Sequence, residues 1–146
     1  MADFSRHATL DWTGDVARGS GRVAAGSGAF AVAATFPRLP APPPGATTPE
    51  ELLAASHATC FGIGLRSVLA QRGGRASRVR VTATVTADKG GGRIRLRAAH
   101  VEGVVEGLAG LDAAALEEVG RAAEEACTIS AALRASVPVT VSVRTA

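Results

Sequence analysis

The sequence is poor in the residue types that most often build metal sites and aromatic cores. Its 146 residues include two cysteines, three histidines, one tryptophan and no tyrosine. The two cysteines lie far apart and no His-rich cluster is present, so the ligand spacing of a zinc site is missing. We therefore expect no metal and no other cofactor.

Charge and hydropathy argue against further classes of protein. The net charge is +3, almost all of the positive charge is arginine, and the arginines are scattered without a basic run. Nucleic-acid binding needs a concentrated basic face, so we expect no nucleic-acid partner. The first ten residues contain charges and no apolar stretch, unlike a signal peptide, and no window approaches about 20 apolar residues. We expect a cytoplasmic protein with no membrane partner.

Length and composition indicate one domain, residues 1–146, with a core made of small side chains. Hydrophobic residues make up 47% of the chain but aromatic residues only 3%, so the core must be built from Ala, Val and Leu. Small apolar side chains bury little area each. A core of this kind often depends on a partner chain.

The N-terminal third alternates short strand patterns with glycine-rich turns, which predicts an antiparallel meander. The strands are expected at 7–12, 19–24 and 29–36, before a proline-rich extended loop at 37–45. A helix then begins with Thr48 as N-cap and Pro49 in the first position, and Glu51 completes a capping box. It is expected to run to about residue 72. Because apolar residues cover most of its sides, we expect this helix to be buried in the centre of the fold.

The rest of the chain combines strands and helices. Strands are expected at 78–86, 93–105 and 137–144, with a turn at 89–92. Four residues of the second of these strands are expected to point inward: Ile94, Leu96, Ala98 and Val101. Asp112 is expected to cap a helix whose apolar spacing continues to Cys127, followed by a short helix or a continuation to residue 134. The order of three strands, helix, two strands, helix and strand predicts an α+β fold with mixed, mostly antiparallel sheets.

The two cysteines are the most informative residues. Cys60 and Cys127 both fall in helical patterns, and few other reactive side chains accompany them. Each could be a small apolar core residue, since unpaired cysteines are commonly buried. In a reducing cytosol two cysteines are more often catalytic, metal-binding or inert than a permanent disulfide, and thiol redox chemistry is the leading hypothesis. His57 lies one helical turn before Cys60 and either lowers the thiol pKa or forms a hydrogen bond in the core.

Three segments carry a family resemblance. Residues 47–61 read Thr-Thr-Pro-Glu-Glu-Leu-Leu-Ala-Ala-Ser-His-Ala-Thr-Cys-Phe. This segment resembles the signature of the OsmC/Ohr family of thiol peroxidases, in which Asn-Pro-Glu-Glu-Leu is followed by a helix ending in His-Ala-x-Cys-Phe. Residues 12–21 are similar to the first hairpin of the OsmC branch. Residues 127–133 resemble the second family motif, Cys-Pro-Val-Ser-x-Ala-Leu, with Thr128 in place of the proline.

The resemblance implies a fold, an activity and a site. The fold is the OsmC-like one, with sheets around two central helices in an intertwined homodimer. The activity is reduction of hydroperoxides, usually organic ones, by a peroxidatic Cys60 that becomes a sulfenic acid and is resolved by Cys127 as a disulfide. A dithiol reductant would restore the thiols. The family lowers the thiol pKa with an Arg held by a Glu. Glu50 matches that Glu; Arg38 is the preferred Arg, and Arg18 in the first hairpin is its rival.

The spacing of Glu50 and Cys60 bears on assembly. Ten residues of a straight helix span about 15 Å along its axis, so an Arg–Glu pair of the same chain could not easily meet the thiol. Either the helix breaks, or the Glu and the Arg come from a second chain. A rival hypothesis is a non-catalytic dimer of the same fold, which binds a small ligand or lipid in a hydrophobic pocket enclosed by the helix and the proline-rich loop.

Overall fold

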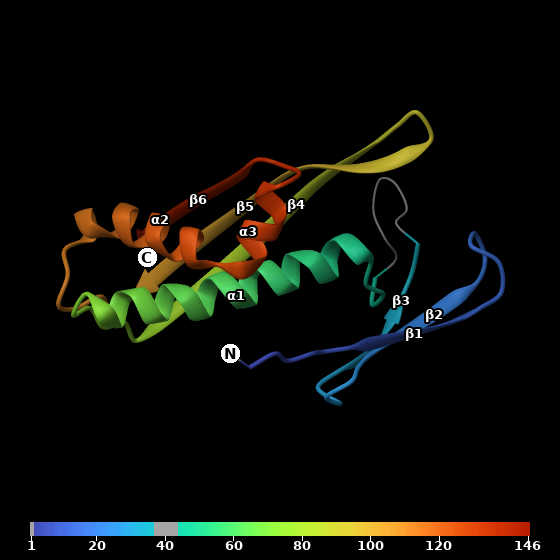
Figure 1. The fold of residues 1–146 in the computed structure, drawn as a ribbon, viewed down its shortest axis with the longest axis horizontal. Coiled ribbons are helices and arrows are strands. Elements are labelled where there is room, and N and C mark those ends of the chain that lie inside the picture. Colours follow the sequence, from blue (N-terminus) through green and yellow to red (C-terminus); the bar gives the residue numbers. More distant parts are fainter. Residues whose placement is uncertain (1, 37–43) are drawn as a thin grey trace. The chain divides into compact units, whose positions relative to one another are not determined.

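The protein is described by a computed structural model that covers residues 2–36 and 44–146. The chain divides into two compact units, Met1–Leu52 and Leu53–Ala146 (Figure 1). The chain contains both strands and helices, in the order of an α+β protein, which confirms the predicted class. Most of the predicted proline-rich loop, including Arg38, lies outside the described residues.

The first unit contains the predicted antiparallel meander. Its strands pair in the order β1-β2-β3. The strands are β1 (Ala8–Thr13), β2 (Ser20–Ala25) and β3 (Ala31–Ala34). Gly14 permits the turn after β1 because it adopts a φ of 90°, and the Asp15 carboxylate closes this turn by accepting the backbone N–H of Arg18 at 2.8 Å. The Trp12 ring lies so close to Gly21, its cross-strand partner, that any larger residue there would collide with it.

The helix start is confirmed where the sequence predicted it. Thr48 Oγ1 accepts the backbone N–H of Glu51 at 3.3 Å, as an N-cap does. The other half of the expected capping box differs, because the Glu51 carboxylate accepts the hydroxyl of Thr47 at 2.8 Å. Thr47 also exchanges two backbone hydrogen bonds with the end of β3, through the carbonyl of Ala33 and the N–H of Thr35. These bonds tie the start of the helix to the meander.

The long helix α1 (Pro49–Gln71) is buried on one face only. Its buried residues recur at spacings of four, four and three, which is the period of one helical stripe. They are His57, Phe61, Leu65, Val68 and Leu69. The expectation of burial on most sides is wrong for the single chain. Ile63 is 68% exposed, and Ala55 and Thr59, which precede it at spacings of four residues on another face of the helix, are also exposed.

Among the described residues, one helix is long and apolar enough to cross a membrane, and it is α1. This corrects the expectation that no segment reaches that length. The buried face of α1 nevertheless packs into the core of the second unit, with Val101, Val105, Leu116 and Val119. Helices that pack in a protein core pass the same test of length and composition.

The second unit is built on a mixed sheet. Its strands pair in the order β4-β5-β6, antiparallel between β4 and β5 and parallel between β5 and β6, which confirms the predicted mixture. The strands are β4 (Arg78–Gly90), β5 (Arg93–Glu106) and β6 (Val139–Thr145). Phe61 and Leu65 of α1 share one core with the inward residues of this sheet and with Val119 of the helix α2 (Leu116–Ala126).

A β-bulge changes which residues of β5 face the core. The register shifts between Thr86 and Ala87, so Arg97 is an extra residue on β5. Beyond the bulge the inward positions are odd-numbered: Ala99 is 2% exposed and Val101 is fully buried. The expectation for Val101 is confirmed and that for Ala98 is wrong, because the bulge moves the alternation by one residue.

The predicted second helix is divided into three pieces. These are a short 3₁₀ turn (Ala113–Ala115), α2 (Leu116–Ala126) and α3 (Thr128–Arg134). Asp112 precedes the 3₁₀ turn and makes no side-chain cap bond to it, so the predicted cap is wrong. Cys127 lies between α2 and α3 with an extended backbone, outside both helices. The chain therefore turns at Cys127 instead of continuing one helix through it.

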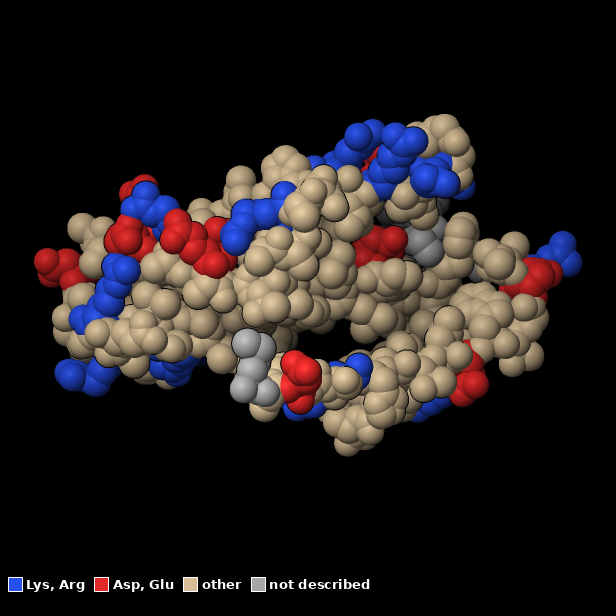
Figure 2. Space-filling view, viewed as in Figure 1, with Lys and Arg blue, Asp and Glu red and all other residues tan. Residues whose placement is uncertain are grey.

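The β4–β5 hairpin gathers charge that is scattered in the sequence. Figure 2 shows basic side chains clustered over the tip of this hairpin. Lys89, Arg93, Arg95 and Arg97 are exposed there. Asp88 forms an ion pair with Arg97. Exposed pairs of this kind contribute little to stability, and the hairpin tip is a solvated surface.

Candidate active site

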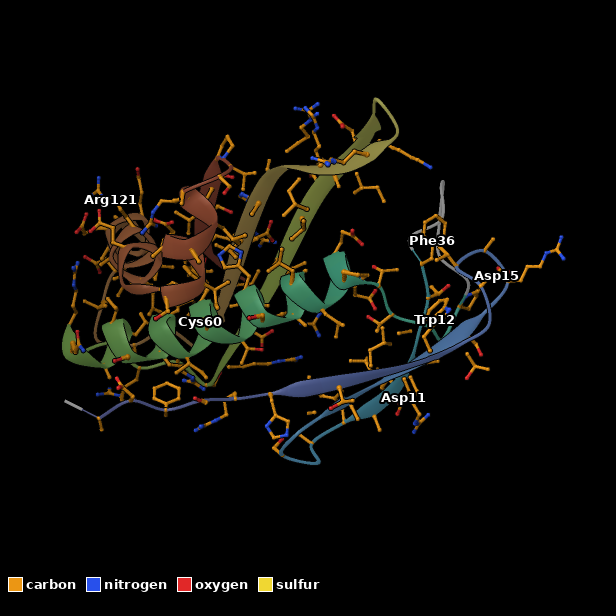
Figure 3. The ribbon with its side chains drawn as sticks, turned by 45° about the vertical axis from the view of Figure 1, so that its right-hand side comes forward. Asp11, Trp12, Asp15, Phe36, Cys60 and Arg121 are labelled. Carbon is orange, nitrogen blue, oxygen red and sulfur yellow. The ribbon has the colours of Figure 1, made fainter. Side chains whose placement is uncertain are left out.

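Cys60 lies in the middle of α1, on the side that faces the start of α3 (Figure 3). Its thiol is partly exposed and is not part of a disulfide. Three hydrogen-bond partners surround it: the backbone N–H groups of Ile129 and Thr128 and the side chain of Cys127. The thiol that the sequence singled out on α1 is therefore next to the other thiol of the chain.

Cys127 is held from both sides. Its backbone N–H donates to the carbonyl of Glu124 at 3.1 Å and ends α2, while its Sγ accepts the backbone N–H of Ser130 at 3.4 Å and begins α3. The side chain is 2% exposed. This double role explains why the helical pattern breaks at Cys127, and it fixes the sulfur at the first turn of α3.

The surroundings of Cys60 favour its thiolate. Burial raises the pKa of the Cys60 thiol, but the N–H of Ile129, the side chain of Cys127 and the N–H of Thr128 together outweigh burial, so that the pKa lies below the ordinary value. A thiolate is the reactive form of cysteine. These donors were missed by sequence reasoning, which looked for a cationic side chain. The one available signal was Thr128, since proline has no N–H to donate.

The structure places the other predicted site residues as follows. Glu50 lies in the first turn of α1, with its Oε2 atom buried and without a hydrogen-bond partner among the described residues. Arg18 is exposed in the turn between β1 and β2, and Arg38 falls outside the described residues. The helix α1 runs without interruption from Pro49 to Gln71, so the alternative of a broken helix is wrong.

His57 is a buried core residue of the second unit. Its ring is fully buried, and Nε2 lies 2.7 Å from the hydroxyl oxygen of Ser130. Burial lowers the pKa of His57 below its ordinary value, and the nearby Glu124 carboxylate raises it in part. Of the two hypotheses for this residue, a hydrogen bond in the core is the one that the geometry supports.

The first unit contains an apolar pocket of about 410 Å³. The side chains of Trp12 and Phe36 contribute to its wall (Figure 3). The other lining residues are mostly aliphatic: Leu10, Val16, Val23, Ala34, Thr35, Thr48, Pro49 and Leu52. The described residues of this lining include no charged side chain, and such a surface suits an apolar ligand or the apolar part of one. Within residues 2–36 and 44–146, no group of three or more His, Cys, Asp or Glu side chains could hold a metal ion.

A thiol on a core helix, paired with a second thiol at the start of a short helix, defines a two-cysteine thiol site. Residues 42–142 match the family model described as OsmC-like protein, and the chain belongs to this family. The predicted membership of the OsmC/Ohr family is thereby confirmed.

Three relatives are informative. The peroxiredoxin OsmC of Escherichia coli K12 is 29% identical over 126 residues, which are 86% of this chain and 87% of that protein. A crystal structure of an organic hydroperoxide resistance protein OsmC from Legionella pneumophila matches with a TM-score of 0.76 and 27% sequence identity. A crystal structure of an organic hydroperoxide resistance protein from Elizabethkingia anophelis matches with a TM-score of 0.78 and 22% sequence identity. Both matches cover 99% of each chain. The fold is the OsmC-like one.

Proposed function

We propose that this protein is a thiol-dependent peroxidase that reduces organic hydroperoxides. The observation that carries the proposal is a pair of hydrogen bonds to the Cys60 thiol from the backbone N–H groups of Thr128 and Ile129. The side chain of Cys127 forms a third hydrogen bond with the same thiol. Donors of this kind stabilise a thiolate, which is the nucleophile that attacks a peroxide O–O bond. The names of the relatives, peroxiredoxin and organic hydroperoxide resistance protein, agree with this activity.

The reaction follows from the two thiols. The Cys60 thiolate attacks the terminal peroxide oxygen, the O–O bond breaks, and the alkoxide takes up a proton and leaves as the alcohol. Cys60 is then a sulfenic acid. The Cys127 sulfur attacks the Cys60 sulfur, the Cys127 proton and the sulfenic hydroxyl leave as water, and a disulfide forms. A dithiol reductant exchanges with this disulfide and returns both thiols. Hydrogen peroxide is a second substrate of the same chemistry.

We propose further that the active unit is a homodimer in which the Glu50 and Arg38 of one chain serve the Cys60 of the other. Ten residues of the uninterrupted α1 helix span about 15 Å, which is too far for Glu50 to reach the thiol along its own helix. Among residues 2–36 and 44–146, no group forms a hydrogen bond with the Oε2 atom of Glu50, and a carboxylate oxygen can accept from an arginine. The exposed apolar stripe around Ile63 is a surface that a second chain can cover.

The two units of the chain are proposed to act as one OsmC-like domain, residues 1–146. The helix α1 is continuous across the boundary at Leu52, and the family match extends over it from residue 42 to residue 142. We place this domain in the cytoplasm, where free thiols persist.

The apolar pocket of the first unit supports a second candidate function. A non-catalytic dimer that binds a small apolar ligand or a lipid would need such a pocket and would not consume its thiols. The peroxidase oxidises Cys60 and Cys127, whereas the binding protein leaves both cysteines reduced.

Counting thiols distinguishes the two functions. The reduced protein is mixed with excess tert-butyl hydroperoxide, and free thiols are counted before and after. The peroxidase loses both thiols of each chain and releases tert-butanol. The binding protein keeps both thiols, and this outcome would overturn the proposal. A Cys60→Ser variant controls for oxidation that does not involve the site.

A further inference from the structure

One buried pair of side chains has no part in the chemistry proposed above. His57 of α1 and Ser130 of α3 are both fully buried, and their Nε2 and Oγ atoms lie 2.7 Å apart. The remaining ring nitrogen of His57, Nδ1, is buried without a hydrogen-bond partner among the described residues. A buried polar atom without a partner costs free energy that an apolar residue would not cost. Packing alone therefore does not explain a histidine at position 57.

Ser130 connects two parts of the site. Its hydroxyl binds His57, which lies one turn before Cys60 on α1, and its backbone N–H donates to the Sγ of Cys127 at 3.4 Å. The same turn of α3 supplies the N–H groups of Thr128 and Ile129 that meet the Cys60 thiol. The His57–Ser130 bond is thus a side-chain link between the helix that carries Cys60 and the turn that carries its partners.

Charged groups near this link keep α3 attached to α2. Glu124 of α2 is buried and forms an ion pair with Arg134 of α3. Arg134 also donates to the backbone carbonyl of Glu124 at 3.3 Å. The Glu124–Arg134 pair fixes the end of α3 to α2, whereas His57 fixes its beginning to α1. The two attachments act at opposite ends of a seven-residue helix.

We propose that His57 and Ser130 form a clamp that positions the first turn of α3, and with it Cys127 and the backbone donors, against Cys60. Both are positioning residues and neither touches the peroxide. The consequence for chemistry rests on the proposed peroxidase function. Release of the clamp lets the first turn of α3 move away from α1, which weakens the hydrogen bonds to the thiol and lengthens the path of the Cys127 sulfur to the Cys60 sulfenic acid.

The test uses the variant Ser130→Ala. The matched control is Ser136→Ala, which changes an exposed serine just after α3. Cys60 alkylation by iodoacetamide is measured against pH, with the modified residue identified by mass spectrometry. We expect the midpoint for Cys60 to rise by about one pH unit in Ser130→Ala and to stay at the parent value in Ser136→Ala. After one equivalent of tert-butyl hydroperoxide, disulfide formation slows about tenfold, the size of effect expected for one buried hydrogen bond.

A second pair of variants separates the clamp from a general loss of structure. His57→Gln introduces an amide that can form a hydrogen bond with the Ser130 hydroxyl, whereas His57→Leu has a similar volume and no polar side-chain atom. We expect His57→Gln to keep the parent midpoint of Cys60 alkylation and the parent rate of disulfide formation. His57→Leu is expected to lose both, although the two variants have equal thermal stability. Equal values for the two variants, or an unchanged midpoint in Ser130→Ala, would overturn the clamp. The alkylation profile requires no peroxide, so it decides the clamp even if the parent protein consumes no hydroperoxide and the proposed function fails.

Discussion

The side chains of Cys60 and Cys127 are hydrogen-bonded to each other, although one lies in the middle of α1 and the other between α2 and α3. We propose that the two sulfurs have different tasks. Cys60 is partly exposed and meets two further backbone donors, so it can attack a small molecule from solvent. Cys127 is buried and forms a hydrogen bond with Cys60.

The first prediction concerns this division of labour. Cys60→Ser removes the proposed nucleophile and abolishes peroxide consumption, because no other thiol faces solvent in the described residues. Cys127→Ser allows one turnover and then stops at the sulfenic acid, which dimedone traps and mass spectrometry detects. Peroxide loss is followed by a colorimetric assay in both variants. Full turnover by Cys60→Ser would contradict the assignment of the two cysteines.

The second prediction uses the residue that departs from the family motif. Thr128→Pro removes one N–H from the Cys60 thiol and leaves the fold intact, since proline is well accepted in the first position of a helix. The Cys60 pKa then rises by about one unit, and the peroxide rate at neutral pH falls about tenfold with the thiolate fraction. Thr128→Ala keeps the N–H and is the matched control. If the alanine variant loses as much activity as the proline variant, the threonine side chain is responsible and the N–H is not.

Local signals in the sequence were sufficient for the start of α1 and for the alternation along β4. The cap at Thr48 and the proline after it act within one turn, and β4 alternates without interruption from Val79 to Val85. The bulge at Arg97 could not be predicted, because it arises from the pairing of two strands. The donors to Cys60 are backbone groups from a distant segment, and the identities of their side chains do not reveal them.

The third prediction concerns the arginine that acts on the thiol. Arg38→Ala raises the Cys60 pKa and slows peroxide reduction, since a cation near a thiolate stabilises it. The thermal stability stays close to that of the parent protein. Arg18→Ala is the comparison, and a larger loss of activity there would assign the role to the first hairpin. If both variants keep parental activity, the backbone donors of α3 are sufficient and no arginine is required.

The fourth prediction follows from the buried imidazole. The folded-state pKa of His57 lies below the ordinary value of 6.5, so below that pH the unfolded chain binds a proton at this residue that the folded chain does not. The free energy of unfolding therefore falls as the pH drops below about 6.5, by at most about 1.4 kcal/mol per pH unit from this group. Urea unfolding of the parent and His57→Gln between about pH 7 and about pH 5 measures the difference. We expect a shallower decline in the variant, and the exposed His7→Gln serves as control. An equally steep decline in His57→Gln would show that other groups cause it.

The last prediction tests the shared site. If Glu50 and Arg38 of one chain serve the Cys60 of another, a Cys60→Ser chain and an Arg38→Ala chain are each impaired alone but complement each other in a heterodimer. One of its two sites then combines an intact Cys60 with an intact Arg38. Mixed heterodimers, prepared with two affinity tags, should therefore recover about half of the parent activity per dimer. A mixture of Cys60→Ser and Cys127→Ser chains is the control, because both changed residues belong to the same half of the site and complementation gives no complete site. Light scattering gives the mass of the parent protein. A fully active monomer would rule out the shared site and require the arginine to reach Cys60 within its own chain.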